Sequence, residues 1–241
     1  MNKNDLLDRL IDIFNALNNL YNKNHEYEDE KFIKRIINWG NIEKEDEDKL
    51  DYFFVMNQCY GPWRDERQKE VWDHVYKPFK VKYNGDLRNI KNSFSYFPFK
   101  WQEDRIIKLS KYLNNKNLSF MEFLESIKNL DGLKTRNEFK KILNAKNTKT
   151  ISTFIRDSLK KDVFPIDTRV QQILTYLGLP QDEDMMVYLS RKVQINPRIF
   201  ERMIYNHYGN LCEKNNCKNC IIKVHCFFPL YLESLFTIKI E

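Results

Sequence analysis

Apolar residues recur at intervals of three and four along almost the whole of this chain, which is the spacing of one face of an α-helix. The pattern is clearest in the segments 6–14 and 106–113. Only 6 glycines occur in 241 residues, and little of the chain shows the polar–apolar alternation of a half-buried strand. The sequence therefore predicts an all-α protein of about ten helices with short connections.

Several helix ends can be placed from residues that favour a first or last turn. The S/T-x-x-E spacing of a capping box stands before an apolar stripe at 119–122 and at 135–138. Asn196 followed by Pro197 indicates the start of another helix, and Gly209 suits its end. We expect helices to begin just after residues 119, 135 and 196.

The composition is that of a globular protein. Apolar residues make up 42%, charged residues 31% and aromatic residues 14%, so disorder over most of the chain is not expected. Acids interrupt the apolar residues of the segment 1–14, which therefore does not resemble a signal peptide. No run approaches the roughly 18 apolar residues of a membrane span. We expect a soluble, intracellular protein.

The charge is mildly basic and unevenly distributed. The formal net charge is +6, bases outnumber acids from 137 to 161, and the segment 26–51 is acidic. A mild excess permits a polyanionic partner such as nucleic acid. It is also common on a face that is merely solvated, so charge alone leaves both interpretations open.

Four of the five cysteines lie close together near the C-terminus, with the spacing C-x4-C-x2-C-x5-C: Cys212, Cys217, Cys220 and Cys226. In a chain without a secretion signal, this clustering favours a metal over disulfides. Sulfur-only ligation suits a [4Fe-4S] cluster or a structural zinc, and the spacing does not separate them. Unligated thiols are the third alternative. We expect Cys59 to be a small buried residue and His225 a surface residue rather than a ligand.

Two apolar helix patterns flank the polar segment "NAKNTK", residues 144–149, which predicts a tight turn between helices. A helix, hairpin and helix present backbone N–H groups to a phosphate. Lys149 stands at the start of the second helix, and Asp167 follows 18 residues later at the start of another. Taken singly, a lysine there is usually solvated and an aspartate there is usually a helix cap.

Taken together, these residues resemble the helix-hairpin-helix DNA glycosylases, most closely the endonuclease III branch. That family has a hairpin, a catalytic lysine, a catalytic aspartate at the same separation in a "VDT" stretch, and a four-cysteine loop. The matching residues are Lys149 in "TKTIS", Asp167 in "FPIDTRV" and the four clustered cysteines. Upstream, "FFVMNQCYG" resembles the helix end that carries the family's glutamine and places Gln58 there. The resemblance covers the chain from about Asp51 to Cys226.

The resemblance implies a two-lobed helix-hairpin-helix DNA glycosylase fold with a C-terminal four-cysteine metal loop. Residues 41–160 would form a six-helix-barrel-like domain with its hairpin near 143–150. Residues 161–241 would form the C-terminal lobe, with the metal cluster loop at 212–226. The N-terminal helix or helices of residues 1–40 would join that lobe.

The resemblance also implies a base-excision repair enzyme, a DNA glycosylase with AP lyase activity that removes oxidised bases from duplex DNA. Lys149 would form a Schiff base with the sugar, and its β-elimination would nick the strand. Asp167 would stabilise the positive charge that develops on the sugar. The implied partner is double-stranded DNA with a damaged base or abasic site. We expect a monomer that is cytoplasmic or nucleoid-associated and binds no membrane.

Further contacts to DNA follow from the same resemblance. The damaged base must leave the duplex before it can be reached, and Gln58 is the candidate to fill the gap. The backbone phosphates would be held by the amides and side chains of the hairpin region: Lys146, Asn147, Thr148 and Thr150.

Two departures from the family pattern bear on these expectations. The family hairpin reads "LPGVG", whereas residues 143–147 read "LNAKN" and contain no glycine. Since asparagine tolerates left-handed backbone geometry, Asn144 or Asn147 would have to take the place of glycine. The first gap between cysteines is also shorter than in the family, which keeps zinc open as the metal.

Other functions remain open. Glycine-poor hairpins are similar to those of archaeal 8-oxoguanine glycosylases, and a mismatch thymine or uracil glycosylase also fits the pattern. From another class, the chain could be a non-catalytic DNA-binding protein with a structural zinc. The missing glycines favour that class, and the pair Lys149 and Asp167 opposes it. The sequence does not indicate the excised base or a role for the tail 229–241.

Overall fold

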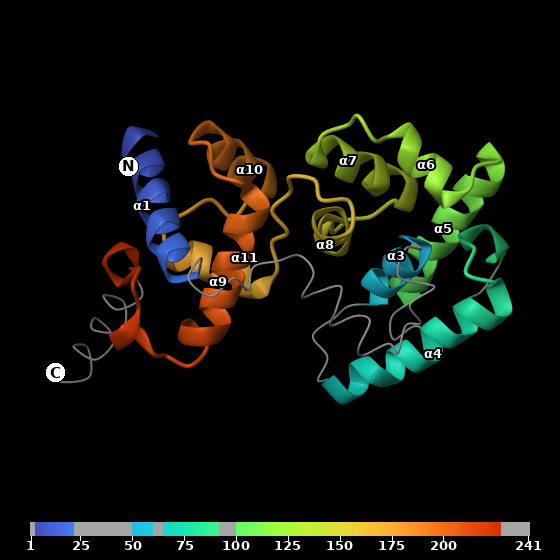
Figure 1. Cartoon of the computed structure of the whole chain (residues 1–241), viewed down its shortest axis with the longest axis horizontal. Coiled ribbons are helices and arrows are strands. Elements are labelled where there is room, and N and C mark those ends of the chain that lie inside the picture. Colours follow the sequence, from blue (N-terminus) through green and yellow to red (C-terminus); the bar gives the residue numbers. More distant parts are fainter. Residues whose placement is uncertain (1–2, 22–49, 60–64, 92–99, 228–241) are drawn as a thin grey trace. The chain divides into compact units, whose positions relative to one another are not determined.

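The computed structural model describes four stretches of the chain: residues 3–21, 50–59, 65–91 and 100–227 (Figure 1). These stretches contain ten α-helices and no strand, which confirms the predicted all-α class and the approximate number of helices. No helix within them is long and apolar enough to cross a membrane. The tail 229–241 and most of the acidic segment 26–51 lie outside the described residues.

The chain divides into two compact units. The first, called here the middle unit, comprises Asp29–Lys161. The second, called here the N/C unit, combines Met1–Glu28 with Asp162–Glu241. Each unit has its own buried core, and each is described separately below.

The described part of the middle unit contains six α-helices: α3 (Leu50–Cys59), α4 (Asp65–Tyr83), α5 (Lys100–Lys116), α6 (Phe120–Ser126), α7 (Gly132–Leu143) and α8 (Lys149–Asp157). Helix α3 packs against α4, α5 and α8, and α7 packs against α5 and α8. Helix α8 is buried on all sides, since every residue from Thr150 to Asp157 is buried. The second helix of the predicted hairpin is therefore an inner element of its unit.

Aromatic rings hold these helices together. The ring of Phe54 on α3 lies 5.3–5.6 Å, between centroids, from three other phenylalanine rings: Phe120 on α6, Phe139 on α7 and Phe154 on α8. All four side chains are fully buried. Each aromatic pair contributes about 0.5–1.5 kcal/mol beyond the burial of its apolar surface. This cluster fixes α7 and α8 against α3, and so fixes the turn that joins them.

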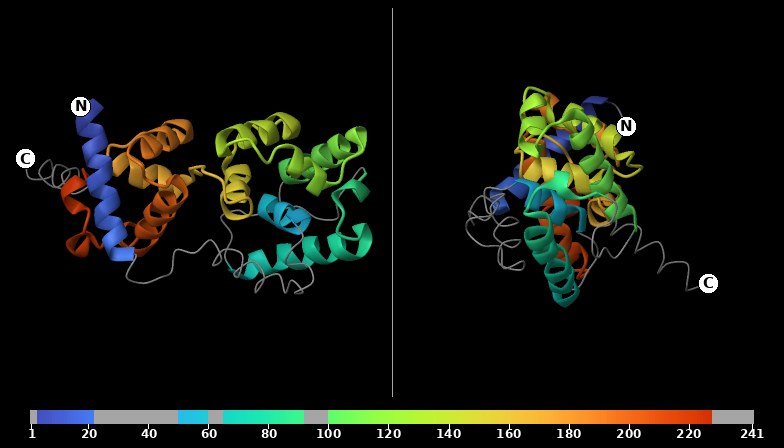
Figure 2. Two further views of the ribbon diagram at one scale, coloured as in Figure 1. Left: turned by 45° about the horizontal axis from the view of Figure 1, so that its top comes forward. Right: turned by 90° about the vertical axis from the view of Figure 1, so that its right-hand side faces the viewer.

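The described part of the N/C unit contains four α-helices: α1 (Lys3–Tyr21), α9 (Thr168–Tyr176), α10 (Glu183–Lys192) and α11 (Pro197–His207). Helix α1 lies beside α11, although they are far apart in the sequence (Figures 1 and 2). The rings of Phe14 and Phe200 meet edge to face, 5.8 Å apart between centroids. A π-helical turn, η4 (Tyr208–Cys212), and two 3-10 turns, η5 (Cys217–Asn219) and η6 (Lys223–His225), follow α11.

The predicted helix starts can be compared with these bounds. The capping box between Ser119 and Glu122 is present, and Asn196 caps α11 with Pro197 in its first turn, so both predictions are confirmed. The capping box predicted at 135–138 is wrong, because α7 begins three residues earlier and its N-cap is Asp131. The helix before Gly209 ends at His207, and Gly209 lies in the π-helical turn.

Candidate functional site

The predicted hairpin is present in the middle unit. Helix α7 ends at Leu143, and Asn144 follows it in the left-handed conformation, with φ 48° and ψ 47°. The N–H of Ala145 donates to the carbonyl oxygen of Lys140 at 3.0 Å, which closes the end of the helix. A residue with a β-carbon is strained in this region of φ and ψ, and asparagine tolerates it best after glycine. Asn144 therefore supplies the geometry that glycine would otherwise provide, as one of the two predicted alternatives.

Lys149 is the first residue of α8, as predicted. The N-cap residue, Thr148, makes no side-chain cap bond. Instead, the side-chain oxygen of Asn147 accepts the N–H of Lys149 at 2.8 Å. Asn147 thus satisfies one of the N–H groups that a helix start leaves without an intrahelical partner. The side chain of Lys149 is half-buried.

The residues predicted to contact DNA fall into two groups. Lys146 and Asn147 are exposed and Thr148 is half-buried, so these three can be reached from solvent. Gln58 and Thr150 are buried, and Gln58 has no exposed surface. The hydroxyl of Thr150 donates to Oε1 of Gln58 at 3.1 Å. In this structure the side chains of Gln58 and Thr150 therefore face the interior of the middle unit.

Arg105 on α5 joins this buried pair, although no sequence motif pointed to it. Its Nη1 donates to Oγ1 of Thr150 at 2.9 Å, and its Nη2 donates to the carbonyl oxygen of Asn147 at 2.6 Å. Its guanidinium carbon also lies 4.6 Å from the centre of the Trp101 ring. Arg105 is only 8% exposed, and burial lowers its pKa. Among the described residues, no carboxylate pairs with it.

Two buried polar atoms beside this cluster have no hydrogen-bond partner among the described residues. They are Nε2 of Gln58 and Oδ1 of the adjacent Asn57. A buried amide without a partner costs about 1–3 kcal/mol, so such atoms are uncommon in a protein interior. The end of α3 that packs against α8 is thus polar, and its two side-chain amides lack part of their hydrogen bonds among the described residues.

Asp167 belongs to the N/C unit, whereas Lys149 belongs to the middle unit. Asp167 is the N-cap of α9, and its Oδ1 accepts the N–H of Val170 at 2.9 Å. Its side chain is half-buried. The prediction that this residue caps a helix is confirmed, and a catalytic role for it stays a prediction.

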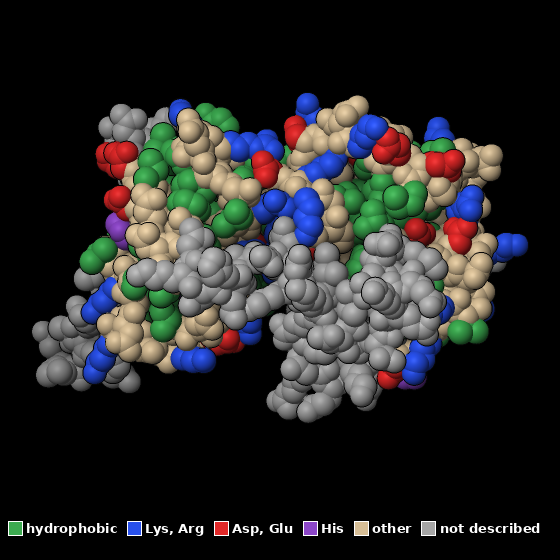
Figure 3. All heavy atoms as spheres, viewed as in Figure 1, with side chains coloured by type: hydrophobic (Ala, Val, Ile, Leu, Met, Phe, Trp, Pro, Cys, Tyr) green, Lys and Arg blue, Asp and Glu red, His purple; other side chains and the backbone are tan. Residues whose placement is uncertain are grey.

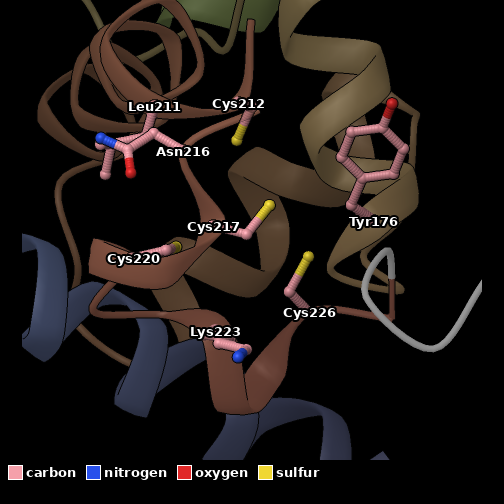
Figure 4. Close-up of a pocket in the computed structure, with 8 residues that line it drawn as sticks. All are labelled: Tyr176, Leu211, Cys212, Asn216, Cys217, Cys220, Lys223 and Cys226. Carbon is pink, nitrogen blue, oxygen red and sulfur yellow. The ribbon is translucent and has the colours of Figure 1, made fainter. Parts of the chain in front are cut away.

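The four clustered cysteines, Cys212, Cys217, Cys220 and Cys226, line one open pocket in the N/C unit. Figure 4 shows the sulfur atoms of Cys212, Cys217 and Cys226 turned toward the same space, with Tyr176 on one side. All four cysteines are free thiols and are half-buried. Among the described residues, no group of three or more His, Cys, Asp or Glu side chains is arranged to hold a metal ion.

Burial raises the pKa of the Cys212 thiol to about 12, and the neighbouring cysteines act in the same direction. Burial likewise raises the pKa of Cys220. Both groups are protonated at neutral pH in the absence of a cation. Because thiolates rather than thiols bind metals, any metal that enters this pocket must displace protons.

A second residue that the sequence did not indicate is His207, which is fully buried at the end of α11. Its Nε2 lies 3.2 Å from the sulfur of Cys220, and its Nδ1 lies 3.3 Å from the hydroxyl of Tyr21 on α1. Burial lowers the pKa of His207 to about 4, so the ring is neutral at pH 7. The neutral ring has one N–H and one acceptor nitrogen, so it donates to one of these two partners and accepts from the other. Helix α1 is thereby connected to the cysteine loop.

Two further contacts join α1 to this loop. Arg9 donates to the carbonyl oxygen of His225, and its guanidinium carbon lies 4.4 Å from the centre of the Phe227 ring. His225 is half-buried and does not line the cysteine pocket.

Basic and acidic side chains are interspersed on the described surface seen in Figure 3, which agrees with the mild net charge.

Comparison of this chain with models of known protein families, with curated proteins and with solved structures found no match. The resemblance to the helix-hairpin-helix glycosylases therefore depends on the residues named above: the hairpin, Lys149, Asp167 and the four cysteines.

Proposed function

We propose that this protein is a helix-hairpin-helix DNA glycosylase of the endonuclease III type, with AP lyase activity on oxidised bases. The observation that carries the proposal is the position of Lys149. It is the first residue of α8, directly after a tight turn that Asn144 opens in the left-handed conformation. A turn of this kind next to a helix N-terminus suits a backbone phosphate, and it places a primary amine beside that phosphate.

The proposed chemistry uses the amine of Lys149 as the nucleophile. The unprotonated amine attacks C1′ of the damaged nucleotide, the N-glycosidic bond breaks, and the base leaves with the electron pair and takes up a proton. Opening of the sugar ring gives an imine between Nζ and C1′. Loss of a C2′ proton then expels the 3′ phosphate by β-elimination, and hydrolysis of the imine frees the lysine.

Asp167 is proposed to stabilise the positive charge that the sugar develops as the base departs. Its role as a helix cap is compatible with this function, because the bond from the N–H of Val170 to Oδ1 holds the carboxyl group in place at the start of α9. An Asp167→Asn variant keeps an oxygen for the cap but loses the charge. We expect it to fold and to lose most of its base excision.

Lys146, Asn147 and Thr148 are proposed to hold the DNA backbone at the hairpin, since all three can be reached from solvent. Thr150 would contribute its backbone, because its hydroxyl is engaged inside the unit. Gln58 can fill the gap in the duplex only if its side chain leaves the site where Thr150 and Arg105 hold it.

For the cysteine pocket we propose a [4Fe-4S] cluster, with zinc as the alternative. Four thiols line a single pocket, and sulfur-only ligation suits either group. A cluster bound there would cross-link the loop. Iron in elemental analysis, with a broad absorbance near the visible–UV edge, is the expected result, and zinc without that absorbance would contradict it.

The lyase proposal is tested by borohydride trapping on duplex DNA with an abasic site. We expect a covalent adduct with the wild-type protein and none with Lys149→Gln. Lys108→Gln, which removes an exposed lysine of α5, is the matched control and should still form the adduct. Absence of an adduct with the wild type would contradict the lyase and favour a DNA-binding protein without catalysis.

The substrate is tested with duplexes that each carry one altered base. Release of oxidised bases without a preference for 8-oxoguanine would support the proposed specificity. Preference for 8-oxoguanine, or for mismatched thymine or uracil, would assign the enzyme to one of the alternative specificities while leaving the Schiff-base chemistry intact.

A further inference from the structure

Lys149 lies between two residues that the same side chain holds. Asn147 precedes it and Thr150 follows it, and Arg105 donates to the carbonyl oxygen of the first and the hydroxyl of the second. These contacts span 42 and 45 residues of sequence. A single guanidinium from α5 thus fixes the chain on both sides of the lysine.

The geometry of the guanidinium explains why one group can do this. Its N–H donors form a planar fork, so two of its nitrogens can reach acceptors on different residues at once. The guanidinium is held in turn by the face of Trp101 and by the side chain of Gln58. Contacts other than those with the hairpin therefore help to orient the Arg105 side chain.

A second link reaches the backbone of Lys149 itself. Asn147, whose carbonyl oxygen accepts from Arg105, also accepts the N–H of Lys149 through its side-chain oxygen. Movement of Asn147 would therefore shift the first turn of α8. Since the turn contains no glycine, its conformation depends on the left-handed Asn144 and on contacts of this kind.

Burial of the Arg105 cation lowers the stability of the folded state unless other interactions offset it. A buried cation that pairs with no carboxylate among the described residues loses hydration without gaining a counter-ion. Arg156 on α8 shows the contrast, because it is also buried but forms an ion pair with Asp157 at 2.7 Å. A purely structural role would be better served by a neutral donor.

We propose that Arg105 is a positioning residue for the nucleophile, because it joins Asn147 and Thr150 and so fixes the backbone from which the Lys149 amine extends. This inference depends on the proposed lyase function. It adds a residue outside the hairpin, on α5, to the groups on which Schiff-base formation depends.

The test compares Arg105→Met with Arg136→Met. Arg136 is a matched control, since it is an equally buried arginine of the middle unit, 7% exposed, that lies on α7 before the turn and donates to the side chain of Asn137. We expect Arg105→Met to slow adduct formation at saturating abasic DNA by about 100-fold, because small displacements of a reacting group cost rates of that order. The DNA concentration for half-saturation should change far less, and Arg136→Met should keep the wild-type rate.

Two further measurements separate positioning from general destabilisation. Hydrogen exchange of the peptide 144–152 should accelerate in Arg105→Met but not in Arg136→Met. Added guanidinium ion should restore part of the rate to Arg105→Ala and none to Arg136→Ala, while Arg105→Lys should stay slow, because one ammonium cannot span both acceptors. If Arg105→Met does not fold, Arg105→Gln serves in its place.

The outcomes separate a failure of the positioning role from a failure of the proposed lyase activity. A wild type that forms no adduct contradicts the lyase itself. A wild type that forms the adduct, together with a folded Arg105→Met that forms it at the same rate, overturns the positioning role and leaves the lyase standing. Equal losses of rate and stability in the Arg105 and Arg136 variants would also overturn it.

Discussion

The hairpin of the middle unit and the cysteine loop of the N/C unit are held in different ways. The hairpin is fixed by contacts that the chain makes with itself, from the left-handed Asn144 to the donors of Arg105. The cysteine loop has only short turns, its contacts with α1 and α11 include those of Arg9 and His207, and its four thiols line an open pocket. The hairpin thus has its shape from contacts within the chain, whereas we propose that a bound metal cross-links the loop.

The largest effect that this comparison predicts is on the metal. Cys220→Ser should purify with little or no bound metal, because a four-thiolate site is lost when one ligand is removed. Cys59→Ser is the control, since Cys59 lies outside the loop and should leave the metal content unchanged. Elemental analysis of both proteins decides the matter, and equal metal content would contradict a role for the loop in binding metal.

The next effect concerns His207. His207→Phe keeps an aromatic ring in a buried position but removes the nitrogen that contacts Cys220. Outer-shell partners of this kind are worth about 10–100-fold in metal affinity, so a chelator should remove the metal faster from this variant. Tyr21→Phe should also speed the loss of metal, but by less, because the Tyr21 hydroxyl contacts His207 and not the Cys220 sulfur. Identical rates of metal loss in all three proteins would show that the contact is irrelevant.

A smaller effect is expected where the hairpin turns. Asn144→Val places a β-branched residue at φ 48°, which should lower the free energy of unfolding by about 1–2 kcal/mol. Asn144→Gly should be neutral or slightly stabilising, because glycine adopts this conformation without strain. Urea denaturation measures both changes. A valine variant as stable as the wild type would mean that the turn has another conformation.

The smallest effect concerns Asp51 at the start of α3, where burial raises the pKa of the carboxyl to about 6. Since the folded pKa exceeds the usual value near 4, folding favours the protonated form. The stability that Asp51 contributes is therefore present below about pH 4 and is lost as the pH rises through about 6. Asp51→Asn should stabilise the protein by about 1 kcal/mol at pH 7, after allowance for the partial exposure of the group, and by almost nothing at pH 4. A constant difference between the two pH values would contradict this.

The sequence was sufficient for features that depend on local spacing. The helical class, the turn before Lys149 and the cap at Asp167 follow from periodicity and from residues that favour helix ends. The capping box predicted at 135–138 is absent because Asp131 caps this helix instead: its side chain accepts the N–H of Lys134, so the helix starts before Thr135. Local patterns compete with one another, and only the packed helix shows which prevails.

The sequence could not supply what depends on packing between distant segments. Thr150 was predicted to contact DNA, and only the packed structure shows that α8 is enclosed on all sides and that the Thr150 hydroxyl meets Gln58 across 92 residues of sequence. Helical spacing places Arg105, four residues before the buried Leu109, nearer the inner face of α5 than the exposed Lys108 and Lys111, but it does not show which groups the guanidinium meets. His207 reaches Tyr21 across 186 residues. These side chains acquire their partners only when the helices assemble.

The central claim is that the amine of Lys149 forms the covalent bond to DNA. It is tested most directly by reducing the complex with an abasic-site duplex, digesting protein and DNA, and locating the attached sugar by mass spectrometry. The account predicts that the sugar is attached to Nζ of Lys149, in the peptide that begins α8. Attachment to a different amine, or no attachment under conditions where the wild-type protein binds the duplex, would contradict it.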